Sequence, residues 1–257
     1  MSALRNHRGL FVDGLYLLSS DSPRAASAPP VPEWVMQLPV FRTVAAGRTL
    51  SFSSPVTVIS GENGTGKSTF LEALAYSCRF PTHGGPWTGN PGSAAENHLF
   101  GRAAALMTGR PMAGWFLRAE SHHRVGRELG ADGPGVRDIN AMSHGQSVVH
   151  VIREAFHASG LYLLDEPESG PVSYTHLTLM AELHQIAELG AQVIVATHSP
   201  IVAAVPGAAI WEIDREAGIR HRDRVTDTVA FQAMEDFLAD PAGIADYMVD
   251  VTADDTH

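Results

Sequence analysis

The chain has 257 residues, of which 44% are hydrophobic, and this is enough to bury one sizeable core. Its formal net charge is −10, which disfavours broad electrostatic binding to nucleic acid and leaves only a local basic patch for such contacts. The one cysteine, Cys78, excludes an internal disulfide, and no stretch approaches the ~20 apolar residues of a membrane span. Because the N-terminal residues also lack the pattern of a secretory signal, we expect a cytoplasmic protein without a membrane span.

Residues 1–36 are expected to form an edge strand followed by a flexible linker. Residues 9–18 alternate loosely between apolar and polar positions, and a stretch rich in Pro, Ser and Ala follows them. Residues 38–44 and 49–53 are then predicted to be strands of an N-terminal β-layer. Phe41 lies in this layer and could stack on an adenine ring, although a place in the core is the favoured interpretation.

Residues 60–70, with the sequence SGENGTGKSTF, fit the phosphate-binding pattern G-x-x-x-x-G-K-[ST]. A β-branched run at residues 55–60 precedes the pattern and predicts a buried strand, while residues 69–76 after it predict a helix. Strand, glycine-rich loop and helix are the context that this motif requires, so a plain surface turn is the weaker interpretation.

Each part of this loop has an expected task. Backbone N–H groups and the helix N-terminus would surround a polyphosphate. Lys67 would reach the β- and γ-phosphates, and the hydroxyl of Ser68 would ligate Mg²⁺. The expected nucleotide-binding residues of the loop are Gly61, Glu62, Asn63, Gly64, Thr65, Gly66, Lys67, Ser68 and Thr69.

The stretch at about residues 80–140 predicts a lateral insertion. Residues 79–101 are rich in Gly, Pro and Asn and predict a long loop, and residues 126–135 form another glycine-rich stretch. A strand is predicted between them at residues 115–121. The length allows a small subdomain and is too short for a long coiled coil.

The sequence MSHGQS at residues 142–147 opens a stretch whose apolar period predicts a helix up to residue 157. Taken alone, it is a weak signal, because Ser143 can be an N-cap with Gln146 in a capping box. Its place just ahead of the next motif favours a functional interpretation.

That next motif is LYLLDEPES at residues 161–169, where four apolar residues predict a buried strand. Asp165 and Glu166 follow at its carboxyl end, where ligands bind in open α/β sheets. Asp165 suits a Mg²⁺ shell, and Glu166 is placed to orient or deprotonate a water. An ordinary solvated turn is the alternative.

A third chemical position is His198, which ends a buried strand predicted at residues 192–197. Because it falls at the same carboxyl edge, we expect it to contact a γ-phosphate; a histidine held only by structural hydrogen bonds is the alternative. The other histidines show no paired ligand spacing, so no zinc site is predicted. The other predicted elements are helices at residues 180–189 and 227–238, hairpin strands at 209–214 and 219–225, and a C-terminal tail at 241–257.

Four motifs in this order, GENGTGKST, MSHGQS, LYLLDEPES and the histidine of ATHSP, resemble the nucleotide-binding domain of ABC-type ATPases. The resemblance spans residues 40–214, and in detail the chain is similar to the small stand-alone ABC-type ATPases of bacteria, of the AAA family of P-loop NTPases. It implies an α/β fold: a P-loop NTPase of ABC type with a mixed sheet, flanking helices, an N-terminal β-layer and a small lateral subdomain. A single ATPase domain would occupy residues 37–240.

The resemblance also implies an activity, which is Mg²⁺-dependent hydrolysis of ATP by a head-to-tail homodimer that forms with ATP. Ser143, Gly145 and Gln146 of one subunit would face the γ-phosphate bound to the other. Glu120 is the nearest candidate for the Mg²⁺-sensing side chain that the family carries after its intermediate strand. The metal set would then be Ser68, Asp165 and Glu120, and the catalytic residues would be Glu166 and His198.

Two other functions stay open. An ATP-gated binding module, closing on a nucleic acid or a protein as in DNA repair, would use the same motifs. The ATPase subunit of an importer is a further interpretation. Two features argue against it: the long N-terminal segment, and His144 in the signature turn at residues 142–147, where ABC transporters carry glycine.

Residues 170–179 depart from the family, which has a short partner-contacting turn there. Residues 172–179, VSYTHLTL, match one reading frame of the transposon-end adapter used in sequencing libraries. Our hypothesis is that they are a sequencing or assembly artefact, and a divergent turn and helix start is the alternative.

Overall fold

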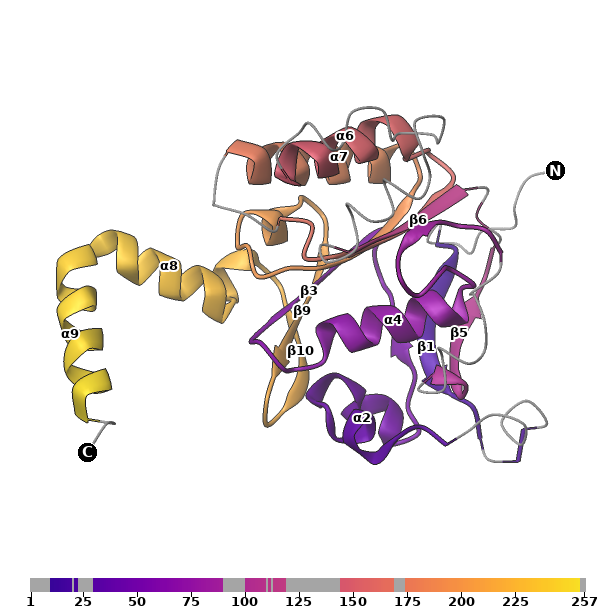
Figure 1. The fold of residues 1–257 in the computed structure, drawn as a ribbon, viewed down its shortest axis with the longest axis horizontal. Helices are drawn as coiled ribbons and strands as arrows, with labels where there is room; N and C mark the ends of the chain where they lie inside the picture. The colour runs from indigo at the N-terminus through magenta and orange to yellow at the C-terminus, as the bar shows by residue number, and fades with distance from the viewer. Residues whose placement is uncertain are drawn as a thin grey trace.

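A mixed sheet of seven strands lies at the centre of the described chain, in the order β10-β9-β3-β8-β7-β6-β4 (Figure 1). The structure, a computed structural model, describes residues 10–19, 21–22, 30–89, 100–109, 111, 113–118, 144–168 and 174–254. The strands from β9 to β6 in this order run parallel, and β10 and β4 close the edges antiparallel. Their bounds are β3 Val56–Gly61, β4 Gly85–Pro86, β6 Ala113–Arg118, β7 Gly160–Asp165, β8 Gln192–Ala196, β9 Ala209–Asp214 and β10 Gly218–Arg222. The mixed α/β class predicted from the sequence is confirmed.

A second, antiparallel sheet has the order β2-β1-β5, with bounds β1 Val12–Leu17, β2 Leu50–Ser51 and β5 Ala103–Met107. The N-terminal strand is therefore central in this small sheet, and its prediction as an edge strand was wrong. The side chain of Gln192 ties this strand to β8, because its Oε1 accepts from the N–H groups of Phe11 and Val12, both at 2.9 Å. Such pairing over a long sequence separation leaves no local signal in the sequence.

The strand predicted at residues 38–44 is also wrong, because this stretch is helical. It continues α2 Glu33–Gln37 as the 3₁₀ turn η1 Pro39–Phe41 and the short helix α3 Arg42–Ala45. Pro39 suits the first turn of a helix, where its missing N–H has no partner to lose. Val40, Phe41 and Val44 are buried together, which fits a helical period. The core interpretation of Phe41 is confirmed, since its ring lies 6.3 Å from that of Phe70.

The large sheet is covered on both faces (Figure 1). Helix α4 Lys67–Ser77 and the small sheet lie on one face, while α6 His144–Ala155 and α7 Tyr174–Glu188 lie on the other. Alternate residues of β7 serve the two cores: Leu161 and Leu163 pack toward α4, whereas Tyr162 and Leu164 pack toward α6 and α7. A strand buried on both faces reads as a continuous apolar run, which is why the sequence located β7 correctly.

The C-terminal helices leave the body of the molecule as an arm (Figure 1). The hairpin of β9 and β10 is confirmed, and after the turn η6 Val225–Asp227 the arm consists of α8 Val229–Ala239 and α9 Pro241–Asp254. The tail predicted at residues 241–257 is thus helical over most of its length. Among the described residues, no helix combines the length and the apolar character needed to cross a membrane.

The lateral stretch at about residues 80–140 is described only in part. Its described residues place β4 and β6 in the large sheet and β5 in the small one. The remaining element is the turn η5 Val202–Ala204, which follows β8. The domain boundaries at residues 36, 80, 140 and 240 stay predictions.

Candidate functional site

Three parallel strands, β3, β7 and β8, end side by side at one edge of the large sheet. Ile59 of β3 and Asp165 of β7 both pair with Ala196 at the end of β8. The ends of these strands and the loops that leave them carry three of the four motifs found in the sequence, so the fold brings these three together at the edge where open α/β sheets bind ligands.

The loop between β3 and α4 needs glycine at both of its ends. Gly61 has a φ of +139° and Gly66 a φ of +97°, values that other residues rarely adopt. A Cβ added at Gly61 would lie 2.6 Å from the carbonyl oxygen of Ile213, and one at Gly66 would lie 2.8 Å from Cγ1 of Val40. The loop is therefore pressed between β9 and the helical turn η1. This unit of strand, loop and helix is a P-loop.

Side chains inside the P-loop close it on itself. The hydroxyl of Thr65 donates to the carbonyl oxygen of Glu62 at 2.8 Å, and Lys67 Nζ donates to the carbonyls of Gly61 and Glu62 at 2.8 and 2.9 Å. Burial lowers the pKa of Lys67, and the negative charges of Glu166, Asp165 and Glu168 oppose this shift. The ammonium group of Lys67 thus lies within the loop, near these carboxylates. Asn63 and Gly64 form the turn at the tip of the loop, and Thr69 lies in the first turn of α4.

Ser68 and Asp165, two of the three expected metal ligands, are in contact: Ser68 Oγ donates to Asp165 Oδ1 at 2.9 Å. Burial raises the pKa of Asp165 to about 6; the charges of Glu166 and Glu72 add to this rise, and Ser68 and Arg118 oppose it. A hydroxyl and a carboxylate are the hard oxygen ligands that Mg²⁺ takes, with phosphates and waters completing its shell.

Among the described residues no group of three or more His, Cys, Asp or Glu side chains could hold a metal ion by itself. The pair Ser68 and Asp165 fits a Mg²⁺ ion that is held jointly with a phosphate ligand. Glu120, the third expected ligand, lies outside the described residues and stays a prediction.

The two expected catalytic residues face each other. His198 Nε2 lies 3.3 Å from Glu166 Oε1, and the two side chains are 37% and 42% exposed. Glu166 has a φ of +49°, an uncommon value for a residue other than glycine and one that occurs preferentially at functional sites. Its backbone N–H donates to the carbonyl of Ala196 at 3.0 Å, which fixes the turn after β7 against the end of β8.

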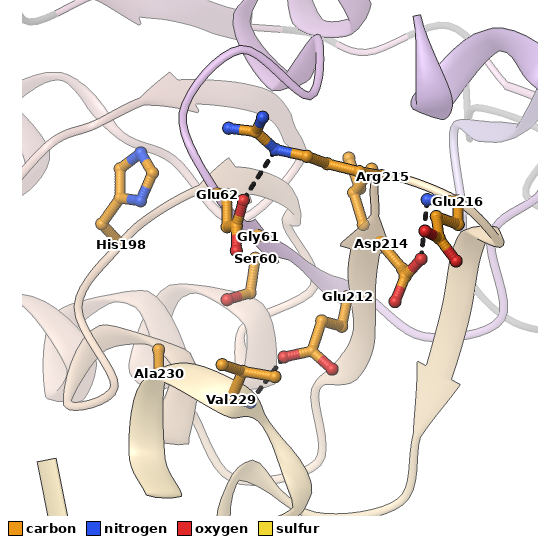
Figure 2. Close-up of a pocket in the computed structure, with 11 residues that line it drawn as sticks. Ser60, Gly61, Glu62, His198, Glu212, Asp214, Arg215, Glu216, Val229 and Ala230 are labelled. Atoms are coloured by element: carbon orange, nitrogen blue, oxygen red, sulfur yellow. Dashed lines mark hydrogen bonds and ion pairs between the residues drawn. The ribbon is translucent and has the colours of Figure 1, made fainter. Parts of the chain in front are cut away.

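A cavity of about 360 Å³ opens beside the P-loop, between Gly61, Glu62, His198 and the start of α8 (Figure 2). Figure 2 shows Arg215 reaching from the β9–β10 turn to Glu62, with 2.7 Å between Nε and Oε2. Arg215 Nη2 also donates to the carbonyl of Asn63 at 3.3 Å. The cavity therefore adjoins the first residues of the P-loop and His198, one member of the catalytic pair.

Arg118, which the sequence analysis missed, ends β6 directly beside Asp165. Its Nη1 lies 2.6 Å from Glu72 Oε1 and donates to the carbonyl of Thr82 at 3.2 Å, while its Nε lies 3.9 Å from Asp165 Oδ2. The available signal was a charged residue at the end of an apolar strand, the same signal that identified Asp165. Arg215 left no such signal, because its partner Glu62 lies far away in the sequence.

The signature turn is only partly described. Ser143 lies outside the described residues, and Gly145 belongs to the first turn of α6, where its surroundings are not described. Gln146 is exposed at the start of α6 and does not line the cavity beside the P-loop. Within one chain the structure therefore does not bring Gln146 to the site, and the role in trans expected for the three residues stays a prediction.

Residues 37–90 match the family described as AAA domain, and this segment contains the whole P-loop. No curated protein matches the chain. Among solved structures, the SMC head domain from Thermotoga maritima is similar with 16% identity and a TM-score of 0.44, over 83% of this chain and 100% of that one. A metal-chelate type ABC transporter in an inward-facing conformation is similar with 14% identity and a TM-score of 0.39, over 70% of this chain and 76% of that one.

Proposed function

We propose that this chain is an ABC-type ATPase that hydrolyses ATP with Mg²⁺ in the cytoplasm and works as an ATP-dependent homodimer. The observation that carries the proposal is the pair Glu166 and His198, whose Oε1 and Nε2 atoms lie 3.3 Å apart. Glu166 directly follows Asp165 at the end of β7, and His198 follows β8. The P-loop with Lys67 lies at the same edge, where the charges of Glu166 and Asp165 act on Lys67, so phosphate-binding and water-activating groups adjoin one another.

Binding of the triphosphate would use groups that are already in place. The N-terminus of α4 and the backbone N–H groups of the loop favour an anion at this position. Lys67 would exchange its two carbonyl partners, Gly61 and Glu62, for oxygens of the β- and γ-phosphates. Ser68 and Asp165 would hold Mg²⁺, which when bound neutralises negative charge on the phosphate oxygens.

The hydrolytic step would use Glu166 as the general base. Its carboxylate is partly exposed toward His198, so it can accept a hydrogen bond from a water placed for in-line attack on the γ-phosphorus. Glu166 then takes the proton of that water as the new P–O bond forms and the bond to the β–γ bridging oxygen breaks. His198 would donate a hydrogen bond to a γ-phosphate oxygen and so hold the transferred group opposite the base.

Dimer formation is the part of the proposal that relies on the signature turn. The exposed position of Gln146 at the helix start supports it, since a second copy can contact only residues at the surface. A Glu166→Gln protein is expected to be a monomer without nucleotide and a dimer with ATP and Mg²⁺. Ser143→Arg should abolish this change in light scattering while ATP still binds, because a cation at a helix N-terminus opposes its dipole. An equal mass with and without ATP in the Glu166→Gln protein would contradict the dimer.

A second function, an ATP-gated binding module, is favoured by one specific observation. A groove of about 730 Å³ between α7 and α8 is lined largely by apolar side chains, among them Leu177, Ile201, Phe231 and Met234. ATP-dependent closure on a macromolecule would give such a surface a use. An apolar groove suits a protein segment, so capture of a protein by the Glu166→Gln form that appears only with ATP would support this function over hydrolysis as an end in itself.

The experiment that tests the proposed function is a phosphate-release assay on the parental protein with ATP, with Mg²⁺ and with EDTA. Hydrolysis should require Mg²⁺, and Glu166→Gln should lower kcat by ~10²–10⁴-fold, the usual contribution of a general base. Glu182→Gln is the matched control, since Glu182 pairs with Arg153 on the surface of α6 and α7. Parental rates in the Glu166→Gln protein would overturn the assignment of the base, and no release by the parental protein would overturn the ATPase.

A further inference from the structure

The carboxylate of Glu168 holds the backbone on which His198 is mounted. Its Oε1 accepts three hydrogen bonds: from Thr197 Oγ1 at 2.5 Å, from the N–H of His198 at 2.8 Å and from the N–H of Ser199 at 3.2 Å. Hydrogen bonds to a charged acceptor are among the stronger ones in proteins. The loop after β8 is thus fastened to the turn after β7 at consecutive residues.

His176 braces the same loop from α7. Its Nδ1 lies 3.1 Å from Ser199 Oγ and its Nε2 lies 3.2 Å from the carbonyl oxygen of Glu168. The hydroxyl of Ser199 also accepts from the N–H of Val202 at 3.3 Å. His176 is only 4% exposed, so this second set of contacts lies in the interior, behind the carboxylate of Glu168.

The side chain of His198, in contrast, is partly exposed, and its position relative to Glu166 depends on the backbone that carries it. Glu166 and Glu168 belong to one short turn. The turn that presents the carboxylate of Glu166 therefore also fixes, through Glu168, the backbone of the histidine opposite. Misplacing a catalytic group by about 1 Å can cost ~100-fold in rate, so such a connection matters for chemistry.

Glu168 itself does not reach the reacting atoms. It does not line the cavity beside the P-loop, and its Oε1 is occupied by three donors. Its other oxygen, Oε2, is buried and has no hydrogen-bond partner among the described residues. A buried carboxylate oxygen without a partner is unfavourable, and strained or unsatisfied groups of this kind concentrate at functional sites.

We infer that Glu168 is a positioning residue for the hydrolytic step: it sets the place of His198 opposite Glu166 by binding the backbone of residues 197–199. This inference rests on the proposed ATPase function. Loss of the carboxylate should disturb the arrangement for attack, whereas the hydrogen bonds inside the P-loop are made by other groups.

The test compares Glu168→Met, which has a similar length and no acceptor, with Glu168→Gln, which keeps an acceptor oxygen. Glu168→Met should lower kcat by about tenfold or more and leave KM and the Kd for ATP within about twofold. Glu168→Gln should restore most of the rate. In a His198→Ala background Glu168→Met should cost less than about twofold, because residues that act through one another are not additive. Glu182→Met is the control for loss of a paired carboxylate away from the site.

A second readout does not depend on activity. Hydrogen–deuterium exchange of the nucleotide-free proteins should be faster in Glu168→Met than in Glu168→Gln or Glu182→Met at the amide of His198. The same change should be smaller at the amide of Ser199, which also donates to Thr197 Oγ1 at 3.0 Å. If Glu168→Met does not fold, Glu168→Asp withdraws the carboxylate by one methylene and should give the same two changes.

Unchanged exchange at His198 and Ser199, or a parental kcat in folded Glu168→Met, would overturn the inference while leaving the ATPase assignment intact. An inactive parental protein would instead overturn the proposed function, and the exchange experiment would still decide whether Glu168 holds the loop.

Discussion

Two regions of the molecule differ in how far their side chains find partners within one chain: the candidate site at the sheet edge and the C-terminal arm. At the edge, polar side chains such as Thr65, Lys67 and Thr197 are buried and hydrogen-bonded within the chain. In α8 no residue is buried, and large apolar side chains of the arm, among them Leu238 and Tyr247, are more than 60% exposed. The edge is thus preorganised in the monomer, whereas the apolar surface of the arm lacks cover among the described residues. We therefore expect the chemistry to depend on the body of the protein and on the start of α8, which lines the cavity, and to depend little on α9.

The largest expected effect on stability is in the core beneath the edge. Leu163 of β7 is fully buried between the sheet and α4. Leu163→Ala should lower the free energy of unfolding by about 2–5 kcal/mol, because the cavity adds to the lost burial. Urea denaturation of this variant, with Leu238→Ala in the arm as the matched control, measures the difference. Equal losses of unfolding free energy in the two variants would contradict the difference in packing between the body and the arm.

Lys67→Ala should lower ATP affinity by at least about tenfold, since hydrogen bonds to charged groups contribute ~1.5–3 kcal/mol. Titration with a fluorescent ATP analogue checks this. Arg42→Ala is a control that removes a cation of α3 whose Nη1 donates to the carbonyl of Glu216 and makes no hydrogen bond to the P-loop. Unchanged binding by Lys67→Ala would show that the P-loop does not hold the phosphates.

Much of the edge could be predicted from the sequence because each motif is local: an apolar strand followed by a glycine loop, an acidic pair or a histidine. The helical turn η1 could not, since a short apolar run fits strand and helix alike, and only its packing against Gly66 decides. The contacts of Arg118 with Asp165 and of Glu168 with His198 were not predicted either. They join residues that are distant in sequence, and no local pattern encodes them.

The origin of residues 172–179 is not decided by their place in the fold. Helix α7 begins inside it at Tyr174, and His176 and Leu179 are buried against the body. This packing accommodates either origin of the segment, evolved protein or adapter sequence. Sequencing of the locus from genomic DNA distinguishes the two, and recovery of the same codons there would end the artefact hypothesis.

The ionised carboxylate of Asp165 is expected to lower the stability of the nucleotide-free protein at neutral pH. Its pKa of about 6 in the folded protein exceeds the ordinary value of 3.8, so the folded state binds more protons between these values. Stability from this group is present below about pH 3.8 and is lost as the pH rises through about 6. Asp165→Asn should therefore stabilise the nucleotide-free protein at pH 7 by roughly 1 kcal/mol or more, since one pKa unit corresponds to 1.36 kcal/mol. Thermal denaturation at pH 7 and pH 4 measures this, and an equal shift at both values would contradict it.

Arg215→Ala should have a smaller effect. Its ion pair with Glu62 is exposed on both sides, and such pairs contribute ~0.2–1 kcal/mol, so ATP affinity should change by less than about fivefold. Binding in low and high salt is the measurement. A tenfold loss that persists in high salt would mean that Arg215 contacts the nucleotide directly.

The smallest effect is expected from removal of α9 by a stop after Asp240. Because α9 packs little against the body, melting temperature and ATP affinity should stay at the values of the full chain. Differential scanning calorimetry and nucleotide titration test this. A large loss of melting temperature or of ATP affinity would show that α9 contributes to the fold of the body.

The most direct test of the central claim is an experimental structure of the Glu166→Gln protein with ATP and Mg²⁺. The triphosphate should lie within the P-loop, with Lys67 Nζ moved from the carbonyls of Gly61 and Glu62 to the phosphates and the metal between Ser68 and Asp165. A nucleotide bound elsewhere, with Lys67 still on the two carbonyls, would contradict it.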